Sequence, residues 1–580
     1  MTLQPDDNPC RPRHFKPAAC APAPLEGPAK QSLETSHTRL IITAALFCLA
    51  FLVISARLVE VAGFKAGETR FAHVHAVDKP EAARADIVDR NGVLLATTLE
   101  APSLYANPKL IHHPERVAEQ LANLLPDLSE GEIAAKLGTD KSFVWIKRQL
   151  TPSQEFEVNR LGVPGLQFQV EDRRVFPKGN LAAHVVGYDD LDGKGLAGIE
   201  RGFDDILKSS SEPVKLSLDV RLQYILRDEI AHTVSDFNAA DGLGIIMDVN
   251  TGEVLAMVSL PDFDPNAPGS ATPEDIFNRV TLGTYEMGST FKIFNTALAL
   301  DTHTATMASS FDATNPIHIG RFTIHDDHAQ RRWLTVPEIF EYSSNIGSAK
   351  MALAVGTDRQ REFLGRLGLL KAPSFELPEI GAPLVPSPWG EVNTMTIAFG
   401  HGISVSPLQM ATAVSAIVNG GVLHRATLLK RPAGYAPSGQ QVISLRTSQE
   451  IRRLMRLVVE HGTGKLAEGS GYLIGGKTGT AEKVAASHYE RKALFSSFIG
   501  VFPITEPRFL VMISIDDPKG DKWSHGFATG GWTAAPAVKR VVERMAPLMG
   551  IQPVDENSPE IRRSLMVDSP DLQERKLAAN

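Results

Sequence analysis

Residues Gly244–Val258 read GIIMDVNTGEVLAMV, two apolar runs on either side of an Asn-Thr-Gly turn. This pattern predicts a β-hairpin. The sequence after the hairpin predicts helices first and strands later, closed by one more helix. The expected elements are a helical run from Ser289 through Leu300, a helix over Leu408–Val418 ended by Asn419-Gly420-Gly421, strands over Tyr472–Thr480, Ser496–Phe502 and Phe509–Ile515, and a helix over Ala535–Leu548. This order predicts an α/β (α+β) domain in which helices flank an antiparallel sheet.

The chain upstream of this domain begins with a polar tail and an apolar segment. Residues 1–39 contain seven prolines and few large apolar residues, which predicts a disordered tail. Leu40–Ala56 (LIITAALFCLAFLVISA) carries no charge, and the run extends to Ala62 if Arg57 and Glu60 reach the membrane interface. We therefore expect a transmembrane helix over residues 40–62. A buried core helix is the alternative, and the absence of a nearby small-x-small cleavage site disfavours a signal peptide.

Residues 63–215 mix short strands with helices. Asp86–Thr97 (DIVDRNGVLLAT) predicts two strands around an Asn-Gly turn, and Pro114–Leu125 and Glu130–Leu137 predict amphipathic helices. Because this region contains no catalytic constellation, we interpret it as a spacer or docking module. The domain that contains the hairpin then covers residues 216–550, and the charged residues 551–580 are expected to fray.

Composition narrows the class of protein. A length of 580 residues favours two or three domains, and 43% hydrophobic with 22% charged residues is typical of globular proteins. The net charge of −8 is mild and argues against a nucleic-acid-binding protein. The three cysteines, Cys10, Cys20 and Cys48, lie in the first tenth of the chain, so its main body can form neither a disulfide nor a cysteine-based metal site.

Three short motifs carry the chemistry. They are Ser289-x-x-Lys292, Ser343-x-Asn345 and Lys477-Thr478-Gly479-Thr480. Average composition would supply about one or two Ser-x-x-Lys pairs by chance in a chain of this length. The chain contains that pair and the Ser-x-Asn pair only once each, and successive motifs begin 54 and then 134 positions apart. The three motifs in this order are therefore strong evidence for a shared site, whereas each motif alone is weak evidence.

The first motif fits a serine nucleophile with a lysine base. Residues i and i+3 lie on one helix face, which places the Lys292 amine beside the Ser289 hydroxyl. A serine hydroxyl needs a base, and lysine serves only if burial or positive charge lowers its pKa. Gly288 permits the sharp turn into the helix, whose N-terminus adds positive potential. A helix-capping serine and a solvated lysine are the alternative for the pair taken alone.

The other two motifs offer relay and binding groups. The Ser343 hydroxyl can relay a proton between Lys292 and a leaving amine, and the Asn345 amide can hold a substrate backbone, although both residue types also favour helix-capping turns. Lys477 and the hydroxyls of Thr478 and Thr480 can bind a carboxylate.

The strand of the third motif is expected to bind an extended peptide. Backbone N–H groups of Ser289 and Thr480 can form an oxyanion hole. Three glycines leave the strand bare, so that a peptide can lie alongside it as an added strand: Gly475, Gly476 and Gly479.

A histidine-rich stretch offers a metal interpretation. His325-x-x-His328 encloses Asp326 and Asp327. A polar loop is the simpler interpretation, and we expect neither a metal nor a cofactor.

The motif set is known from penicillin-binding proteins and class A β-lactamases. The chain resembles class B penicillin-binding proteins, and most closely the division-specific (septal) penicillin-binding protein 3 type. The matching stretches are Ala83–Ala96, Arg174–Gly187, Gly195–Phe203, Thr251–Pro261, Tyr285–Lys292, Phe399–Met410, Asn419–Gly421 and Gly476–Lys483. Ala85 and Met287 depart from the family pattern, where Gly and Pro are usual, and neither touches the chemistry.

The resemblance implies a peptidoglycan D,D-transpeptidase that β-lactams acylate. Ser289 would attack stem peptides that end in D-Ala-D-Ala, with Lys292 as general base and Ser343 as proton relay. Asn345 would bind substrate, and the Lys477–Thr480 motif, including Gly479, would contact its carboxylate and complete the oxyanion hole. Elongation-specific class B enzymes, β-lactamases or carboxypeptidases of the same fold, and a penicillin-binding sensor without turnover are the alternatives.

The resemblance also implies a location and partners. The enzyme would be a single-pass protein of the bacterial inner membrane, with a cytoplasmic tail and a periplasmic catalytic domain at the division septum. Lysines and arginines lie on both sides of the apolar run, so charge alone does not fix this orientation. Residues 63–215 would be an elongated, non-catalytic pedestal (dimerisation-like) domain. The partners would be a polytopic glycosyltransferase of the shape, elongation, division and sporulation family, docked on the pedestal and the transmembrane helix, and other division proteins.

Overall fold

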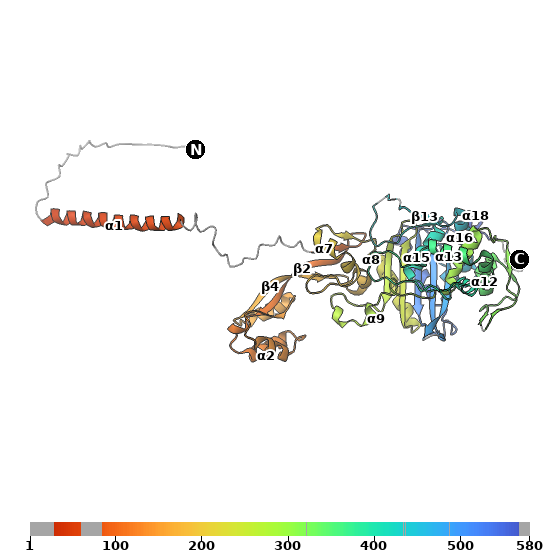
Figure 1. Cartoon of the computed structure of the whole chain (residues 1–580), viewed down its shortest axis with the longest axis horizontal. Coiled ribbons are helices and arrows are strands. Elements are labelled where there is room, and N and C mark those ends of the chain that lie inside the picture. Colours follow the sequence, from red (N-terminus) through yellow and green to blue (C-terminus); the bar gives the residue numbers. More distant parts are fainter. Residues whose placement is uncertain are drawn as a thin grey trace, which may run out of the picture. The chain divides into compact units, whose positions relative to one another are not determined.

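The computed structural model describes residues 28–59, 84–320, 322–432, 434–435, 437–485 and 488–567. The chain divides into two compact units, Met1–Pro80 and Glu81–Asn580. The described part of the first unit is helix α1, Pro28–Val59 (Figure 1). Its segment Arg39–Ala56 is long and apolar enough to cross a membrane by length and composition. The prediction of disorder up to residue 39 is wrong from residue 28 onward, whereas residues 1–27 and 60–62 lie outside the described residues.

The second unit begins with a five-stranded sheet. Its strand order is β3-β2-β1-β5, and β4 also pairs with β2, antiparallel to it. The Asn-Gly hairpin and both amphipathic helices of the pedestal are confirmed. The elements are β1 (Ile87–Val88), β2 (Leu94–Ala106), α2 (Pro114–Leu124), α3 (Glu130–Leu137), β3 (Val144–Lys147), α4 (Pro152–Arg160), β4 (Leu166–Val175), α5 (Ala183–Val186), α6 (Gly198–Gly202), α7 (Asp204–Ser209) and β5 (Val214–Lys215).

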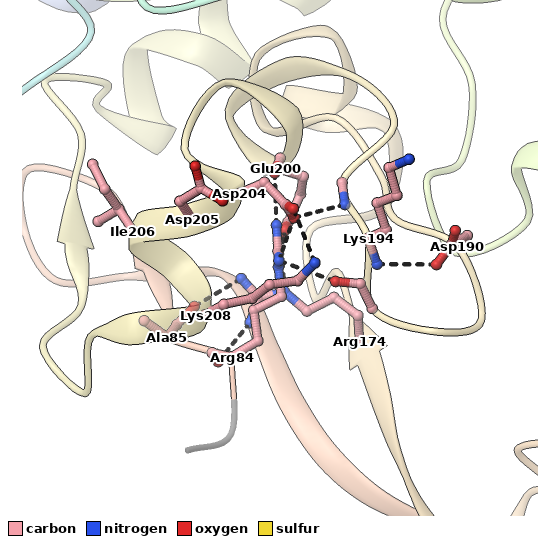
Figure 2. Close-up of polar contacts among 12 residues, drawn as sticks. Arg84, Ala85, Arg174, Asp190, Lys194, Glu200, Asp204, Asp205, Ile206 and Lys208 are labelled. Carbon is pink, nitrogen blue, oxygen red and sulfur yellow. Dashed lines mark hydrogen bonds and ion pairs between the residues drawn. The ribbon is translucent and has the colours of Figure 1, made fainter. Parts of the chain in front are cut away.

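A buried ionic cluster ties distant parts of this region together (Figure 2). Glu200 on α6 is fully buried and accepts from Arg84 Nε at 2.5 Å and from Arg174 Nε at 2.8 Å. Arg84 also donates to Asp204 Oδ1 at 2.7 Å. Both arginines share the carboxylate of Glu200, and Asp204 also pairs with Lys208 at 2.9 Å. The cluster therefore fixes the chain before β1, the end of β4 and the start of α7 relative to one another.

The larger part of the second unit is built on a five-stranded sheet in the order β14-β15-β16-β6-β7, and every neighbouring pair is antiparallel. The predicted Asn-Thr-Gly hairpin is confirmed as β6 and β7. The predicted strand over Tyr472–Thr480 starts three residues later and runs further. The strands are β6 (Asp241–Asp248), β7 (Val254–Leu260), β14 (Gly475–Ala485), β15 (His488–Phe502) and β16 (Phe509–Asp516).

Helices cover both faces of this sheet (Figure 1). Helices α8 (Val220–Asp236) and α17 (Ala534–Leu548) bury one face in a core that includes Leu226, Val511 and Val538. The larger core on the other face includes residues of α10 (Lys292–Asp301) and α15 (Pro407–Val418). The predicted antiparallel sheet flanked by helices is confirmed.

The remaining elements complete this larger layer and the loops around it. The helices are α9 (Pro273–Ile276), α10 (Lys292–Asp301), α11 (Val336–Glu341), α12 (Asn345–Val355), α13 (Thr357–Arg366), α14 (Glu391–Ile397), α15 (Pro407–Val418) and α16 (Leu445–Glu460). The short strands are β8 (Ser310–Asp312), β9 (Ile317–Ile319), β10 (Phe322–Ile324), β11 (Trp333–Thr335), β12 (Val422–Leu423) and β13 (Gln440–Gln441).

The C-terminal segment corrects one prediction. Residues expected to fray form a helix, α18 (Pro559–Leu565), whose Ile561 and Leu565 pack against the larger core. Ser564 O accepts from Arg453 Nε at 2.9 Å. Burial of apolar side chains holds this segment on α16 despite its charge; residues 568–580 lie outside the described part of the chain.

Candidate active site

Ser289 stands on a tight turn at the start of α10. Gly288–Phe291 forms a single 3-10 turn that leads directly into α10, so the predicted start of a helix at Ser289 holds to within one residue. Gly288 has a φ of +54°, and a Cβ on it would lie 2.6 Å from Thr480 O and 3.3 Å from Thr480 N. The turn thus presses against β14, which brings the backbone of Ser289 and Thr480 side by side.

The amine of Lys292 is the centre of the site. It is fully buried, and its Nζ lies 2.9 Å from Ser289 Oγ and 3.0 Å from Ser343 Oγ. It also contacts Ser343 O at 2.5 Å and Asn345 Oδ1 at 2.8 Å. These two carbonyl oxygens can only accept, so they take two N–H groups of the amine. In the neutral form the remaining lone pair is left for a hydroxyl.

Burial sets the protonation of this amine. Removal from water disfavours the ammonium and lowers the pKa of Lys292 to about 7, although Asp326 and Asp327 oppose the shift. Near neutral pH a large share of the lysine is therefore uncharged. The arrangement can accept the Ser289 proton, which an ordinary lysine cannot do at this pH.

Ser343 lies between two lysines. It has a φ of +58°, and its Oγ contacts both Lys292 Nζ and Lys477 Nζ at 3.0 Å. The helix-capping role belongs instead to Ser344, whose Oγ accepts from Gly347 N at 2.9 Å. The unusual backbone conformation of Ser343 therefore turns its hydroxyl toward the amines rather than toward α12.

Asn345 is held at both ends of its amide. Nδ2 donates to His325 O at 3.0 Å, which directs Oδ1 toward Lys292. The predicted contact with a substrate backbone can use the second N–H of the amide or the second lone pair of Oδ1. Within this structure the first role of Asn345 is to accept from the lysine.

The third motif lies on β14. Lys477 is fully buried, its Nζ lies 5.9 Å from the Phe340 ring centroid, and burial with the neighbouring Lys292 lowers its pKa well below the ordinary range. The Thr478 hydroxyl is 2.7 Å from Thr463 Oγ1. These contacts gather amine and hydroxyl groups next to Ser343, where a carboxylate can bind.

The structure requires the glycines of β14 for a different reason from the predicted one. A Cβ on Gly476 would lie 2.3 Å from Phe498 Cζ, and one on Gly479 would lie 2.4 Å from Ser497 Oγ and 2.7 Å from Met287 O. Both glycines therefore allow close packing within the protein rather than a bare strand. Among the described strands, β14 is still at the edge of its sheet, so an extended peptide can pair with it.

Two contributors were missed from the sequence. Thr463 precedes β14 in a loop and reaches Thr478. Asp326 is buried, and its carboxylate accepts from Ser344 Oγ at 2.7 Å, Asn345 N at 2.6 Å and Ile346 N at 2.9 Å. In the described part of the chain, no group of three or more His, Cys, Asp or Glu residues could hold a metal. His325 and His328 thus flank a carboxylate that caps a helix.

Comparisons with known proteins agree with this geometry. The family of penicillin-binding protein transpeptidase domains matches residues 242–543, and the penicillin-binding protein dimerisation domain matches residues 79–232. The chain is 42% identical over 486 residues to the probable peptidoglycan D,D-transpeptidase FtsI of Caulobacter vibrioides, covering 81% of this chain and 82% of that protein. It is 28% identical to the peptidoglycan D,D-transpeptidase FtsI of Escherichia coli, covering 89% and 92%.

Solved structures resemble the fold. The transpeptidase domain of Burkholderia pseudomallei penicillin-binding protein 3 is 32% identical with a TM-score of 0.53, covering 59% of this chain and 98% of that domain. Penicillin-binding protein 3 of Mycobacterium tuberculosis, complexed with aztreonam, has a TM-score of 0.65 at 24% identity, covering 82% and 98%.

Proposed function

The chain belongs to the class B penicillin-binding proteins of the penicillin-binding protein 3 type, and we propose that it is a peptidoglycan D,D-transpeptidase with Ser289 as its nucleophile. The relatives named D,D-transpeptidases support the reaction. One observation carries the assignment of the nucleophile: Lys292 Nζ lies 2.9 Å from Ser289 Oγ, in a buried environment that favours the neutral amine.

The acylation step follows from the donors and acceptors around Lys292. Ser289 Oγ attacks the carbonyl between the two terminal D-Ala residues of a stem peptide, and its proton passes to the neutral Lys292. Backbone N–H groups of Ser289 and Thr480 stabilise the oxyanion. Ser343 then relays the proton to the departing amine of D-Ala, which leaves an ester on Ser289.

The binding and deacylation steps use the remaining groups. Lys477 with Thr478 and Thr480 binds the terminal carboxylate, and Gly479 keeps β14 close to the turn of Ser289. The second N–H of Asn345 binds the substrate backbone. The amine of a neighbouring stem peptide gives its proton to Lys292 and attacks the ester, which forms the cross-link and restores the serine. A β-lactam acylates Ser289 in the same way, but its leaving amine stays tethered to the acyl group, so the whole ring-opened molecule remains attached to the serine.

A fluorescent penicillin tests this proposal. Wild-type protein should take one label, whereas Ser289→Ala and Lys292→Met should take none, with circular dichroism and thermal melting showing that both variants fold. Equal labelling of Ser289→Ala would reject the nucleophile. Rapid loss of the label from wild type would instead favour a β-lactamase.

We propose the following organisation in the cell. Residues 40–62 anchor the chain in the inner membrane by a single pass, residues 63–215 form the pedestal, and residues 216–550 form the catalytic domain on the periplasmic side, where its substrate lies. The relatives named FtsI favour septal over elongation-specific synthesis. A polytopic glycosyltransferase is the partner expected to dock on the anchor and the pedestal.

Localisation of a fluorescent fusion in dividing cells tests the septal role. The signal should gather at midcell during constriction. A signal along the lateral wall would favour the elongation-specific alternative.

A further inference from the structure

A buried carboxylate lies directly behind the second motif. Asp326 follows β10 by two residues and is 8% exposed. Its Oδ1 accepts from the backbone N–H groups of Asn345 and Ile346 at 2.6 and 2.9 Å, and its Oδ2 accepts from Ser344 Oγ at 2.7 Å. One side chain thus satisfies two N–H groups in the first turn of α12, a position where negative charge is favourable.

The neighbouring residue completes the attachment. His325 O accepts from Asn345 Nδ2 at 3.0 Å. Asn345 is therefore held by Asp326 through its backbone and by His325 through its side chain. The third polar group of Asn345, Oδ1, is left facing Lys292 Nζ at 2.8 Å.

We infer that Asp326 is a positioning residue of the acylation reaction: it fixes the start of α12 so that Ser343 and Asn345 face Lys292, and it supplies the negative charge that accompanies this amine. The inference rests on the proposed function of Ser289 and Lys292. Asp326 itself makes no contact with the nucleophile and acts through Asn345 and Lys292.

The charge around Lys292 gives this role a measurable signature. Asp326 is the first and Asp327 the second of the charges that raise the pKa of Lys292 against the larger effect of burial. The Lys477 amine faces Lys292 across Ser343, whose Oγ contacts both amines. On the neighbouring helix α11, Glu338 is paired with Arg332.

The remaining titratable groups nearby are few. Glu341 on α11 is buried, and the side chain of His325 is exposed. On α12 itself, Lys350 lies 3.5 Å from Asp312. None of these groups is among the charges that shift the pKa of Lys292, so substitution of Asp326 isolates the charge under test.

The two adjacent aspartates form a matched pair for the test. Asp327 is exposed and lacks the hydrogen bonds to α12 that Asp326 makes. The second-order rate constant of acylation by a fluorescent penicillin is measured from pH 5 to pH 10 for full-length wild type, Asp326→Asn and Asp327→Asn. Asp326→Asn should lower the plateau about tenfold or more, because hydrogen bonds to a charged group are lost. It should also move the midpoint of the acidic limb to lower pH.

The control separates charge from position. Asp327→Asn should move the midpoint in the same direction by a smaller amount and leave the plateau unchanged. Asp326→Glu restores the charge but displaces it, so its midpoint should return toward that of wild type while its plateau stays low. This variant also decides the question if Asp326→Asn does not fold.

Several results would overturn the inference. A wild-type plateau for Asp326→Asn would show that the carboxylate does not position the site. Asp326→Asn could instead lower the plateau without moving the midpoint, and Asp326→Glu could give the same plateau and midpoint as Asp326→Asn. That result would reduce Asp326 to a purely structural role. Failure of the wild type to acylate at Ser289 would instead reject the proposed function.

Discussion

The pH dependence of acylation is the most quantitative consequence of the buried Lys292. Only the neutral amine can accept the Ser289 proton, so the rate falls as the pH falls through the pKa of Lys292. With that pKa at about 7, the neutral fraction is about one tenth at pH 6, one half at pH 7 and nine tenths at pH 8. The second-order rate constant of acylation should therefore rise about ninefold from pH 6 to pH 8 and then level off.

An ordinary lysine would behave differently. With a pKa of about 10.4, roughly 0.04% of it is neutral at pH 7, and this fraction rises about tenfold per pH unit up to about pH 10. Stopped-flow acylation with a fluorescent penicillin distinguishes the two curves, after correction for penicillin hydrolysis in buffer alone. Lys292→Arg is the control, because a guanidinium stays charged throughout and should abolish acylation at every pH. A wild-type rate that keeps rising tenfold per unit beyond pH 8 would refute Lys292 as a base with a pKa near 7.

Two further substitutions test the turn of Ser289 and the ionic cluster of the pedestal. Gly288→Ala should lower the rate of acylation about 100-fold, because a Cβ would lie 2.6 Å from Thr480 O at a φ of +54° and would displace the nucleophile. Stopped-flow rates measured on a variant that keeps the wild-type melting temperature check this prediction. A rate within twofold of wild type would contradict it. Glu200→Ala should lower the free energy of unfolding by about 3–5 kcal/mol, because it leaves Arg174 buried without its carboxylate and Arg84 with Asp204 alone. Urea denaturation measures this loss, and a change below about 1 kcal/mol would mean that water replaces the carboxylate.

The sequence predicted those parts of the site in which the functional residues lie at a short, fixed separation along the chain. Ser289 lies in the 3-10 turn that leads into α10, and Lys292 is the first residue of α10. The separation of three residues in continuous helical backbone places the amine beside the hydroxyl. The hairpin over Gly244–Val258 and the strands and helix near the C-terminus were predicted by their apolar periodicity, because alternation and helical spacing are local properties. The fold could be predicted from these local patterns, and the family from the three motifs and the matching stretches.

The parts that the sequence did not predict depend on contacts between distant segments. Asp326 had the appearance of a polar loop residue or a metal ligand, because nothing in its neighbourhood shows that α12 starts beside it. Thr463 carries no motif at all. Gly476 and Gly479 were correctly noted as special, but the reason lies in Phe498 and other side chains that fold against them from elsewhere in the chain.

The helical structure near the two ends of the chain was missed for a related reason. The region from residue 551 is charged and short of large apolar residues, which predicts fraying. Ile561 and Leu565 nevertheless find apolar partners on the larger core, and this burial outweighs the local composition. At the other end, α1 begins at Pro28, within a stretch that its prolines had assigned to the tail.

The central claim is that Ser289 becomes acylated with Lys292 as its base. Mass spectrometry of the full-length protein after incubation with a penicillin, followed by peptide mapping, tests it most directly. The mass of the protein should increase by that of one penicillin, the adduct should map to the peptide that contains Ser289, and Lys292→Met should form none. An adduct on any other residue, or an unmodified Ser289 in folded wild-type protein, would contradict the account.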